Sequence, residues 1–147
     1  PNALRQELID PCHRHLTYLR ISVTDRCNLR CASDAPGETA KYADRRDASD
    51  AELLQLFRLV QRVRPLGKLR LTGGEPLLRP GLADLVRRLR ALLPDAVLAL
   101  TTNGSLLSQS ASPLHDAGLD ALNVSLDTLD PIAFATLTRG GDRKSVV

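Results

Sequence analysis

The sequence predicts an α/β fold in which parallel strands alternate with helices. Short apolar runs, suited to strands buried on both faces, recur four times along the 147 residues. Helical patterns with clear starts and stops lie between them, and polar clusters follow the strands. Strands separated by helices form right-handed β-α-β units and a parallel sheet. Four such units are half of an eight-stranded barrel, so the sheet is either open or part of a (β/α) barrel.

The strands are predicted over residues 19–23, 69–71, 97–101 and 122–125. Two of these apolar runs carry an arginine, Arg20 in the first and Arg70 in the second. An unpaired charge is costly to bury. The two arginines therefore indicate either a clamp for a phosphate or carboxylate, or an inward salt bridge with Asp or Glu.

The first two helices are predicted from their ends. Ser49 and Glu52 form a capping box, and a helical apolar face follows them as far as Pro65. A second helical pattern covers residues 82–93 and ends before Pro94.

The two later helices are marked by prolines. We expect the third helix to begin at Ser112-Pro113 and to end at Gly118. The fourth opens at Asp130, with Pro131 at the first helical position, where the missing N–H costs nothing.

Composition limits the class of protein. Apolar residues make up 43% and charged residues 25% of the chain, which is enough apolar content for one domain with a core. No apolar run reaches the roughly 18 residues of a membrane-spanning helix, and the polar N-terminus is not a secretory signal, so we expect no membrane partner. The odd number of cysteines, three, favours a reducing compartment, the cytoplasm, over a disulfide framework.

The charge pattern favours a small ligand. The net charge is +3, and the arginines are scattered along the expected helices instead of forming a stripe. Two Tyr and two Phe offer few rings on which bases could stack. We therefore expect no nucleic acid partner and favour a small phosphorylated ligand.

The two ends of the sequence suggest an excised piece. The chain starts at Pro1, contains no Met and ends at residues 145–147, where the fourth helix should still be continuing. We therefore expect a truncated sheet or barrel. Its exposed edges would invite association, which leaves room for a homodimer.

Polar clusters follow all four predicted strands. They comprise residues 24–31, 72–76, 102–104 and 125–127. Ligands bind at the carboxyl ends of the strands in barrels and in open α/β sheets alike. Four clusters on one rim therefore predict a functional site.

The first cluster holds two cysteines, Cys27 and Cys31, in a C-x-x-x-C spacing. The spacing alone is equally compatible with two small buried residues. Arg26 and Arg30 flank the pair, and nearby guanidinium groups favour the thiolate, the form that binds metal. Cys12 lies far upstream and is interpreted as a bystander.

The second cluster holds the paired glycines Gly73 and Gly74. They indicate either a simple tight turn or a strand end where a ligand approaches the backbone without meeting a Cβ atom. Pro76 keeps Glu75 extended, which turns the carbonyls of the loop toward the rim and suits an ammonium group on a ligand.

Four motifs together carry a resemblance to a known family. LRISVTDRCNLRC, KLRLTGGEP, LALTTNG and LNVSLDTLDP follow one another over residues 19–31, 68–76, 98–104 and 122–131. With them the chain resembles the radical S-adenosylmethionine (SAM) superfamily and, within it, the GTP 3′,8-cyclases of molybdenum cofactor biosynthesis. The resemblance implies a partial TIM-type (β/α) barrel, with residues 1–147 as the N-terminal portion of a radical SAM core domain.

The resemblance also implies a function and its residues. The family uses a 4Fe-4S cluster and S-adenosyl-L-methionine to generate a radical that starts the cyclisation of GTP, the first step of the pathway. No protein side chain is implied as acid or base. By residue, the implied roles are the cluster for Cys27 and Cys31, SAM for Gly74 and Ser125, and GTP for Arg20, Arg70 and Thr102.

The chain departs from the family pattern at one ligand. The family has C-x-x-x-C-x-Y-C, whereas Cys31 is followed here by Ala32, Ser33 and Asp34. A carboxylate is a hard ligand and a poor substitute for a thiolate on a soft cluster. From this substitution and from the expected truncation we expect impaired activity. The alternatives are a non-catalytic nucleotide-binding remnant of the same fold, or another radical SAM enzyme that acts on a peptide, against which Arg20 and Arg70 argue.

Overall fold

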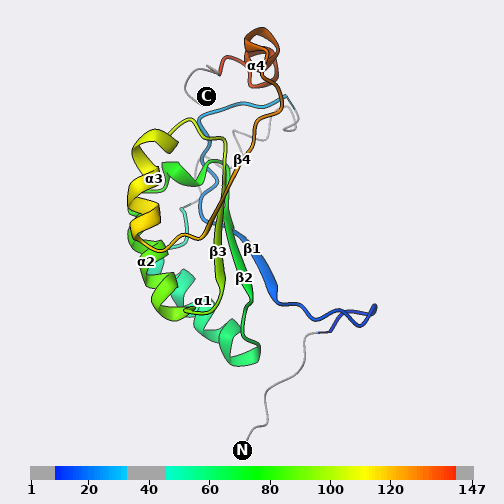
Figure 1. The fold of residues 1–147 in the computed structure, drawn as a ribbon, viewed down its shortest axis with the longest axis vertical. Coiled ribbons are helices and arrows are strands. Elements are labelled where there is room, and N and C mark those ends of the chain that lie inside the picture. Colours follow the sequence, from blue (N-terminus) through cyan, green and yellow to red (C-terminus); the bar gives the residue numbers. More distant parts are fainter. Residues whose placement is uncertain (1–8, 33–45, 142–147) are drawn as a thin grey trace, which may run out of the picture.

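The computed structural model describes residues 9–32 and 46–141 (Figure 1). These residues contain a four-stranded parallel sheet with the strand order β1-β2-β3-β4. The strands are Tyr18–Ser22 (β1), Lys68–Thr72 (β2), Val97–Thr102 (β3) and Ala121–Val124 (β4), each within about one residue of its predicted bounds. Every connection adds the next strand on the same side. This is the order of a barrel wall, since the order of a doubly wound sheet reverses.

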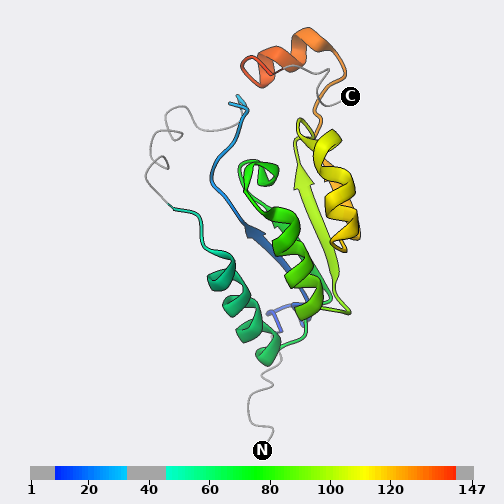
Figure 2. The same cartoon turned by 90° about the vertical axis from the view of Figure 1, so that its left-hand side faces the viewer.

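The helices are Asp50–Val63 (α1), Leu82–Leu92 (α2), Leu107–Asp116 (α3) and Pro131–Leu137 (α4), with a 3-10 turn, η2, over Pro76–Leu78. Helices α1, α2 and α3 lie together on one face of the sheet, and α4 lies beyond the carboxyl ends of the strands (Figures 1 and 2). The predicted starts of α1 and α4 are confirmed. Ser49 and Glu52 form the capping box, and Asp130 caps the helix that Pro131 opens.

The third helix was predicted wrongly. It begins at Leu107, not at Ser112-Pro113, and it contains Pro113. An interior proline costs about 3 kcal/mol because one hydrogen bond is lost. Leu107, Ala111 and Leu114 nevertheless recur at helical spacing, and Leu114 is buried in the core. The apolar face therefore outweighs the proline as a helix signal.

The core lies between the sheet and the helices. Leu69 and Leu71 of β2 and Leu98 and Leu100 of β3 are at most 1% exposed. They belong to one cluster with residues of the helices, among them Phe57, Leu85, Val86, Leu89 and Leu114. The helix-facing side of the sheet is thus a continuous apolar layer.

The opposite face of the sheet is polar. Successive side chains of a strand point to opposite faces, so Arg70 and Thr72 point away from the helices that cover Leu69 and Leu71. The register places Arg20 beside Arg70, and Ser22 beside Thr72. None of the helices among the described residues has the length and apolar character needed to span a membrane.

Candidate functional site

A cavity of about 260 Å³ lies at the carboxyl ends of the strands. Residues from all four predicted polar clusters line it, together with two residues of the strands. The lining residues are Arg20, Cys27, Leu29, Cys31, Thr72, Gly73, Gly74, Thr101, Thr102, Asn103 and Ser125. Six of the seven site residues expected from the resemblance are among them, and Arg70 is the exception. The structure therefore brings the expected residues together, although their roles stay predictions.

The segment that carries the cysteines lies along the glycine loop. The amide of Gly74 donates to the carbonyl of Thr24 at 2.9 Å, and the amide of Glu75 donates to that of Arg26 at 2.7 Å. A Cβ atom on Gly73 would lie 2.4 Å from the Thr24 oxygen, and one on Gly74 would lie 2.4 Å from the Arg26 oxygen. Both glycines are therefore required by the chain itself, a reason that differs from the turn or ligand approach inferred from the sequence.

Glu75 is a structural residue that the sequence did not reveal. It is extended before Pro76, as predicted, but its carboxylate is fully buried. The Thr102 hydroxyl donates to one carboxylate oxygen at 2.6 Å, and the Asn103 amide donates to the other at 2.7 Å. Glu75 thus fastens the loop after β3 to the loop after β2.

This arrangement bears on the expected role of Thr102. Its side chain is 2% exposed, and its hydroxyl both donates to Glu75 and accepts from the Gly104 amide at 3.0 Å. Thr101, the residue before it, is partly exposed and accepts from an Arg70 guanidinium nitrogen at 3.3 Å. The Thr102 hydroxyl is therefore already engaged in holding the rim of the cavity.

A second link fastens the cysteine segment to β3. Asn28, between the two cysteines, accepts from Asn103 at 2.9 Å and donates to the hydroxyl of Ser105 at 2.8 Å. The Ser105 hydroxyl in turn donates to the Asn103 carbonyl oxygen at 2.7 Å. The three side chains form a closed ring of hydrogen bonds. Position 28 needs a side chain that both donates and accepts a hydrogen bond, and the amide of Asn28 does both.

Helix α4 holds the far end of the cysteine segment. The amides of Arg30 and Ala32 donate to the carbonyls of Thr138 at 3.3 Å and Leu137 at 2.7 Å, which lie at the end of this helix. Residues 24–32 are therefore attached to the loop after β2, to the loop after β3 and to α4.

Both thiols of the pair line the cavity, with Cys27 exposed and Cys31 partly exposed. The amide of Leu29 donates to the sulfur of Cys27 at 3.4 Å. The guanidinium of Arg26, expected to favour the thiolate form, forms an ion pair with Asp47 at 2.8 Å. Its charge is thus largely balanced by that carboxylate.

The donor set fits a soft metal centre in part. Two thiols from one segment suit iron, but no group of three or more His, Cys, Asp or Glu able to hold a metal is found within residues 9–32 and 46–141. Asp34, at the third position of the family pattern, lies outside those residues, as does Ser33. Cys12 is exposed and does not line the cavity.

The two strand arginines have no carboxylate partner among the described residues. Arg20 donates to the hydroxyl of Thr72 at 3.4 Å, Arg70 donates to Thr101, and the Nε atom of Arg70 is buried without a hydrogen-bond partner. The inward salt bridge is therefore not formed there. In the described part of the chain these two neighbouring guanidinium groups donate to hydroxyls and meet no carboxylate, which suits an anionic ligand.

Comparison with known proteins places these features in a family. The sequence model described as "Radical SAM superfamily" matches residues 21–147. GTP 3′,8-cyclase of Pseudomonas entomophila (strain L48) is 46% identical over 144 residues, covering 97% of this chain and 42% of the relative. GTP 3′,8-cyclase of Streptomyces coelicolor is 47% identical over 141 residues, covering 95% and 41%. The chain thus spans about two fifths of the length of the curated relatives it matches.

A solved structure agrees on the fold. Streptococcus suis SuiB, described as bound to S-adenosylmethionine, superposes with a TM-score of 0.64 over 86% of this chain and 27% of its own. The sequences are 18% identical, so this likeness shows the fold alone. A strand order that runs sequentially from β1 to β4 is what a partial (β/α) barrel requires.

Proposed function

The chain belongs to the radical SAM superfamily, and from that premise we propose that residues 1–147 are the N-terminal portion of the core domain of a GTP 3′,8-cyclase. The observation that carries the proposal is the cavity that gathers both cysteines, Gly74 and Ser125 at one end of the polar sheet face. The relatives with this activity match over almost the whole chain. Molybdenum cofactor biosynthesis is the pathway that this activity serves.

In this proposal Cys27 and Cys31 hold a 4Fe-4S cluster, and Gly74 and Ser125 position S-adenosyl-L-methionine. Together these cofactors supply the reductive cleavage of SAM that begins radical chemistry. The protein supplies no acid or base. Its residues hold the cysteine segment in place at the rim of the cavity.

GTP is the proposed substrate, with Arg20, Arg70 and Thr102 as its contacts. The in-register pair Arg20 and Arg70 supports a triphosphate, because each guanidinium presents several donors and has no carboxylate among the described residues. The hydroxyl of Thr102 is engaged with Glu75, so Thr102 would contribute to the GTP site by holding the rim of the cavity in place. The thiols need a reducing compartment, for which we propose the cytoplasm.

Asp34 favours a second candidate function, a nucleotide-binding protein without redox chemistry. The arginine pair does not depend on the cysteines, because it lies on β1 and β2, whereas the thiols follow β1. Binding of GTP that is unaffected by Cys27→Ala and Cys31→Ala would favour this candidate. Loss of binding in these variants would count against it.

Anaerobic reconstitution with iron and sulfide tests the cyclase proposal. We expect substoichiometric iron in the chain with Asp34 and about four irons per chain in Asp34→Cys, since a third thiolate completes the soft ligand set. Cys12→Ala is the matched control and should leave the iron content unchanged. Absence of a cluster in Asp34→Cys would refute the cluster-binding part of the proposal.

A homodimer stays a prediction. Within residues 9–32 and 46–141, strand β4 lies at an edge of the sheet, and its residues Leu122 and Val124 are 41% and 40% exposed. An edge strand with unpaired backbone groups can pair with a second chain. Sedimentation of the chain over a range of concentrations would measure this.

A further inference from the structure

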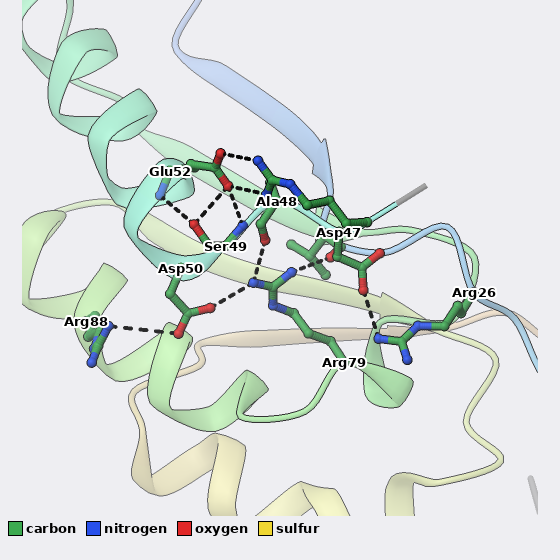
Figure 3. A network of polar contacts seen from close by, with 10 residues as sticks. Arg26, Asp47, Ala48, Ser49, Asp50, Glu52, Arg79 and Arg88 are labelled. Carbon is green, nitrogen blue, oxygen red and sulfur yellow. Dashed lines mark hydrogen bonds and ion pairs between the residues drawn. The ribbon is translucent and has the colours of Figure 1, made fainter. Parts of the chain in front are cut away.

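Arg79 is a buried arginine. It forms hydrogen bonds with residues that precede the cysteine segment in the sequence and with residues that follow it. It is 8% exposed and follows η2, directly after the loop of the paired glycines. One terminal nitrogen donates to the carbonyl of Val23 at 2.6 Å, and the other donates to the carbonyl of Ala48 at 2.7 Å. The latter nitrogen also pairs with a carboxylate oxygen of Asp50 at 2.8 Å (Figure 3).

These partners lie at two places far apart in the sequence. Val23 directly follows β1 and lies immediately before the segment that carries Cys27 and Cys31. Ala48 and Asp50 lie where α1 begins. The guanidinium group therefore holds the residue that leads into the cysteine segment next to the residues that lead into α1.

A second and more exposed link runs parallel to the first. Arg26 pairs with Asp47 at 2.8 Å (Figure 3). On the α1 side, Arg46 pairs with Glu52 at 2.7 Å beside the capping box. The side chains of Arg26 and Arg46 are 60% and 74% exposed, so water weakens these pairs. The side chain of Arg79 is 7% exposed, and its loss would leave the buried carbonyl of Val23 without this donor. Arg79 is therefore the stronger of the two links.

Lysine does not reproduce this geometry. A guanidinium group directs several donors in a fixed plane, and here its two terminal nitrogens reach three acceptors. An ammonium group is a compact point charge on a flexible chain. A lysine at position 79 would keep the charge and lose part of the fork.

We propose that Arg79 is a positioning residue for the thiols of Cys27 and Cys31. By joining the carbonyl of Val23 to Ala48 and Asp50, it restricts where the cysteine segment can leave β1. The geometry is independent of any cofactor, but the use of the two thiols as a metal site rests on the function proposed above. The role is one of orientation, and Arg79 itself does not line the cavity.

The test uses the full chain with Cys12→Ala, so that the remaining thiols are Cys27 and Cys31. Arg79→Gln and Arg79→Lys are compared with the control variant Arg87→Gln. Arg87 is an exposed arginine of α2 that forms an ion pair with Asp84. Cd²⁺ alone is the probe, titrated through its thiolate charge-transfer absorption. Amide hydrogen exchange locates any loosening.

We expect Arg79→Gln to weaken Cd²⁺ binding about tenfold, which corresponds to about 1.4 kcal/mol. Amide exchange in residues 24–32 and 46–50 should rise at least about tenfold, with β3 and α3 unchanged. Arg79→Lys should recover part of the affinity, and Arg87→Gln should match the parent. If Arg79→Gln does not fold, Cd²⁺ affinity and amide exchange are compared between Arg79→Lys and the parent instead.

Parent-like Cd²⁺ affinity and exchange in a folded Arg79→Gln variant, or in Arg79→Lys if Gln does not fold, would overturn the proposal. A uniform rise in exchange that includes β3 and α3 would do the same, because it would indicate a role in global stability. Failure of the cyclase proposal looks different. A chain in which Cd²⁺ affinity depends on Arg79, but which forms no iron–sulfur cluster even with Asp34→Cys, retains the positioning role and loses the cluster.

Discussion

The two faces of the sheet are built from the same strands and do different things. On the face toward the helices, leucines of β2 and β3 are at most 1% exposed and form the core. On the other face, Arg20 and Arg70 stand side by side without a carboxylate partner in the described residues. Burial of apolar surface stabilises the fold, whereas neighbouring like charges oppose it. The first face therefore accounts for folding, and the second is the face that we propose binds a ligand.

The largest expected effect is on the helix-covered face. Leu100→Ala should lower the free energy of unfolding by about 2–5 kcal/mol, because a side chain with no exposed surface is replaced by a cavity. Urea denaturation measures this. A change below about 1 kcal/mol would contradict the assignment of the core to this face.

The next largest effect on stability is expected at the glycine loop that follows β2. Gly74→Ala should cost roughly 1–3 kcal/mol, since its Cβ atom would lie 2.4 Å from the Arg26 oxygen. Gly67→Ala is the matched control, because the nearest atom to its Cβ lies at an ordinary 3.7 Å. Amide exchange should localise the effect of Gly74→Ala to residues 24–32. Equal stability of the two variants would show that the close approach is not needed.

On the polar face, a substitution should separate binding from stability. Arg70→Met should weaken GTP binding by about tenfold or more through loss of a charged hydrogen bond, with stability unchanged or raised. Arg58→Met, on the exposed side of α1, is the control and should bind GTP like the parent. Calorimetric titration gives the dissociation constant. Unchanged GTP affinity would remove Arg70 from the proposed substrate site.

The smallest expected effect depends on pH at the exposed link between Arg26 and Asp47. Burial opposes ionisation of Asp47, but hydrogen bonds from Arg26 and Thr24 and the Arg26 charge hold the pKa of Asp47 below its usual value. Hydrogen bonds from Arg46 and Ser49 likewise lower the pKa of Glu52. A carboxyl with a lowered pKa in the folded state stabilises the fold above its unfolded pKa and loses that contribution as pH falls.

The urea midpoint should therefore stay level from about pH 7 to 5 and decrease below about pH 4. Asp47→Asn should reduce the decrease, and Asp84→Asn, in another exposed ion pair, should leave the contribution of Asp47 in place. A midpoint that rises on acidification would mean that the sign of the Asp47 effect is wrong.

Much of the fold could be predicted because it depends on neighbours in the sequence. The capping box of Ser49 and Glu52 and the start of α4 at Pro131 are local, and both are present. The start of α3 was missed because a local rule about Pro113 was given more weight than the apolar face around it. That face was visible in the spacing of Leu107, Ala111 and Leu114.

The site could be predicted only in outline. The four polar clusters were placed on one rim, because parallel strands end at the same edge. The structural role of each residue could not be predicted, because that role depends on contacts with residues of the other clusters. Gly74 is required by the carbonyl of Arg26, and Thr102 is engaged by Glu75. The pairing of Arg26 with Asp47 could not be predicted either, because it spans twenty-one positions.

The sequence by itself determined the alternation of strands and helices, the cysteine pair and the family motifs, all of which depend on residue type and short spacing. Only the tertiary structure decided which face of the sheet is covered, which carboxylates the arginines meet, and that Arg79 reaches Val23 across fifty-six positions. The physical reason is one of range. Propensity and capping act over a few residues, whereas the partner of a buried charge is chosen by packing between segments that the linear order keeps apart.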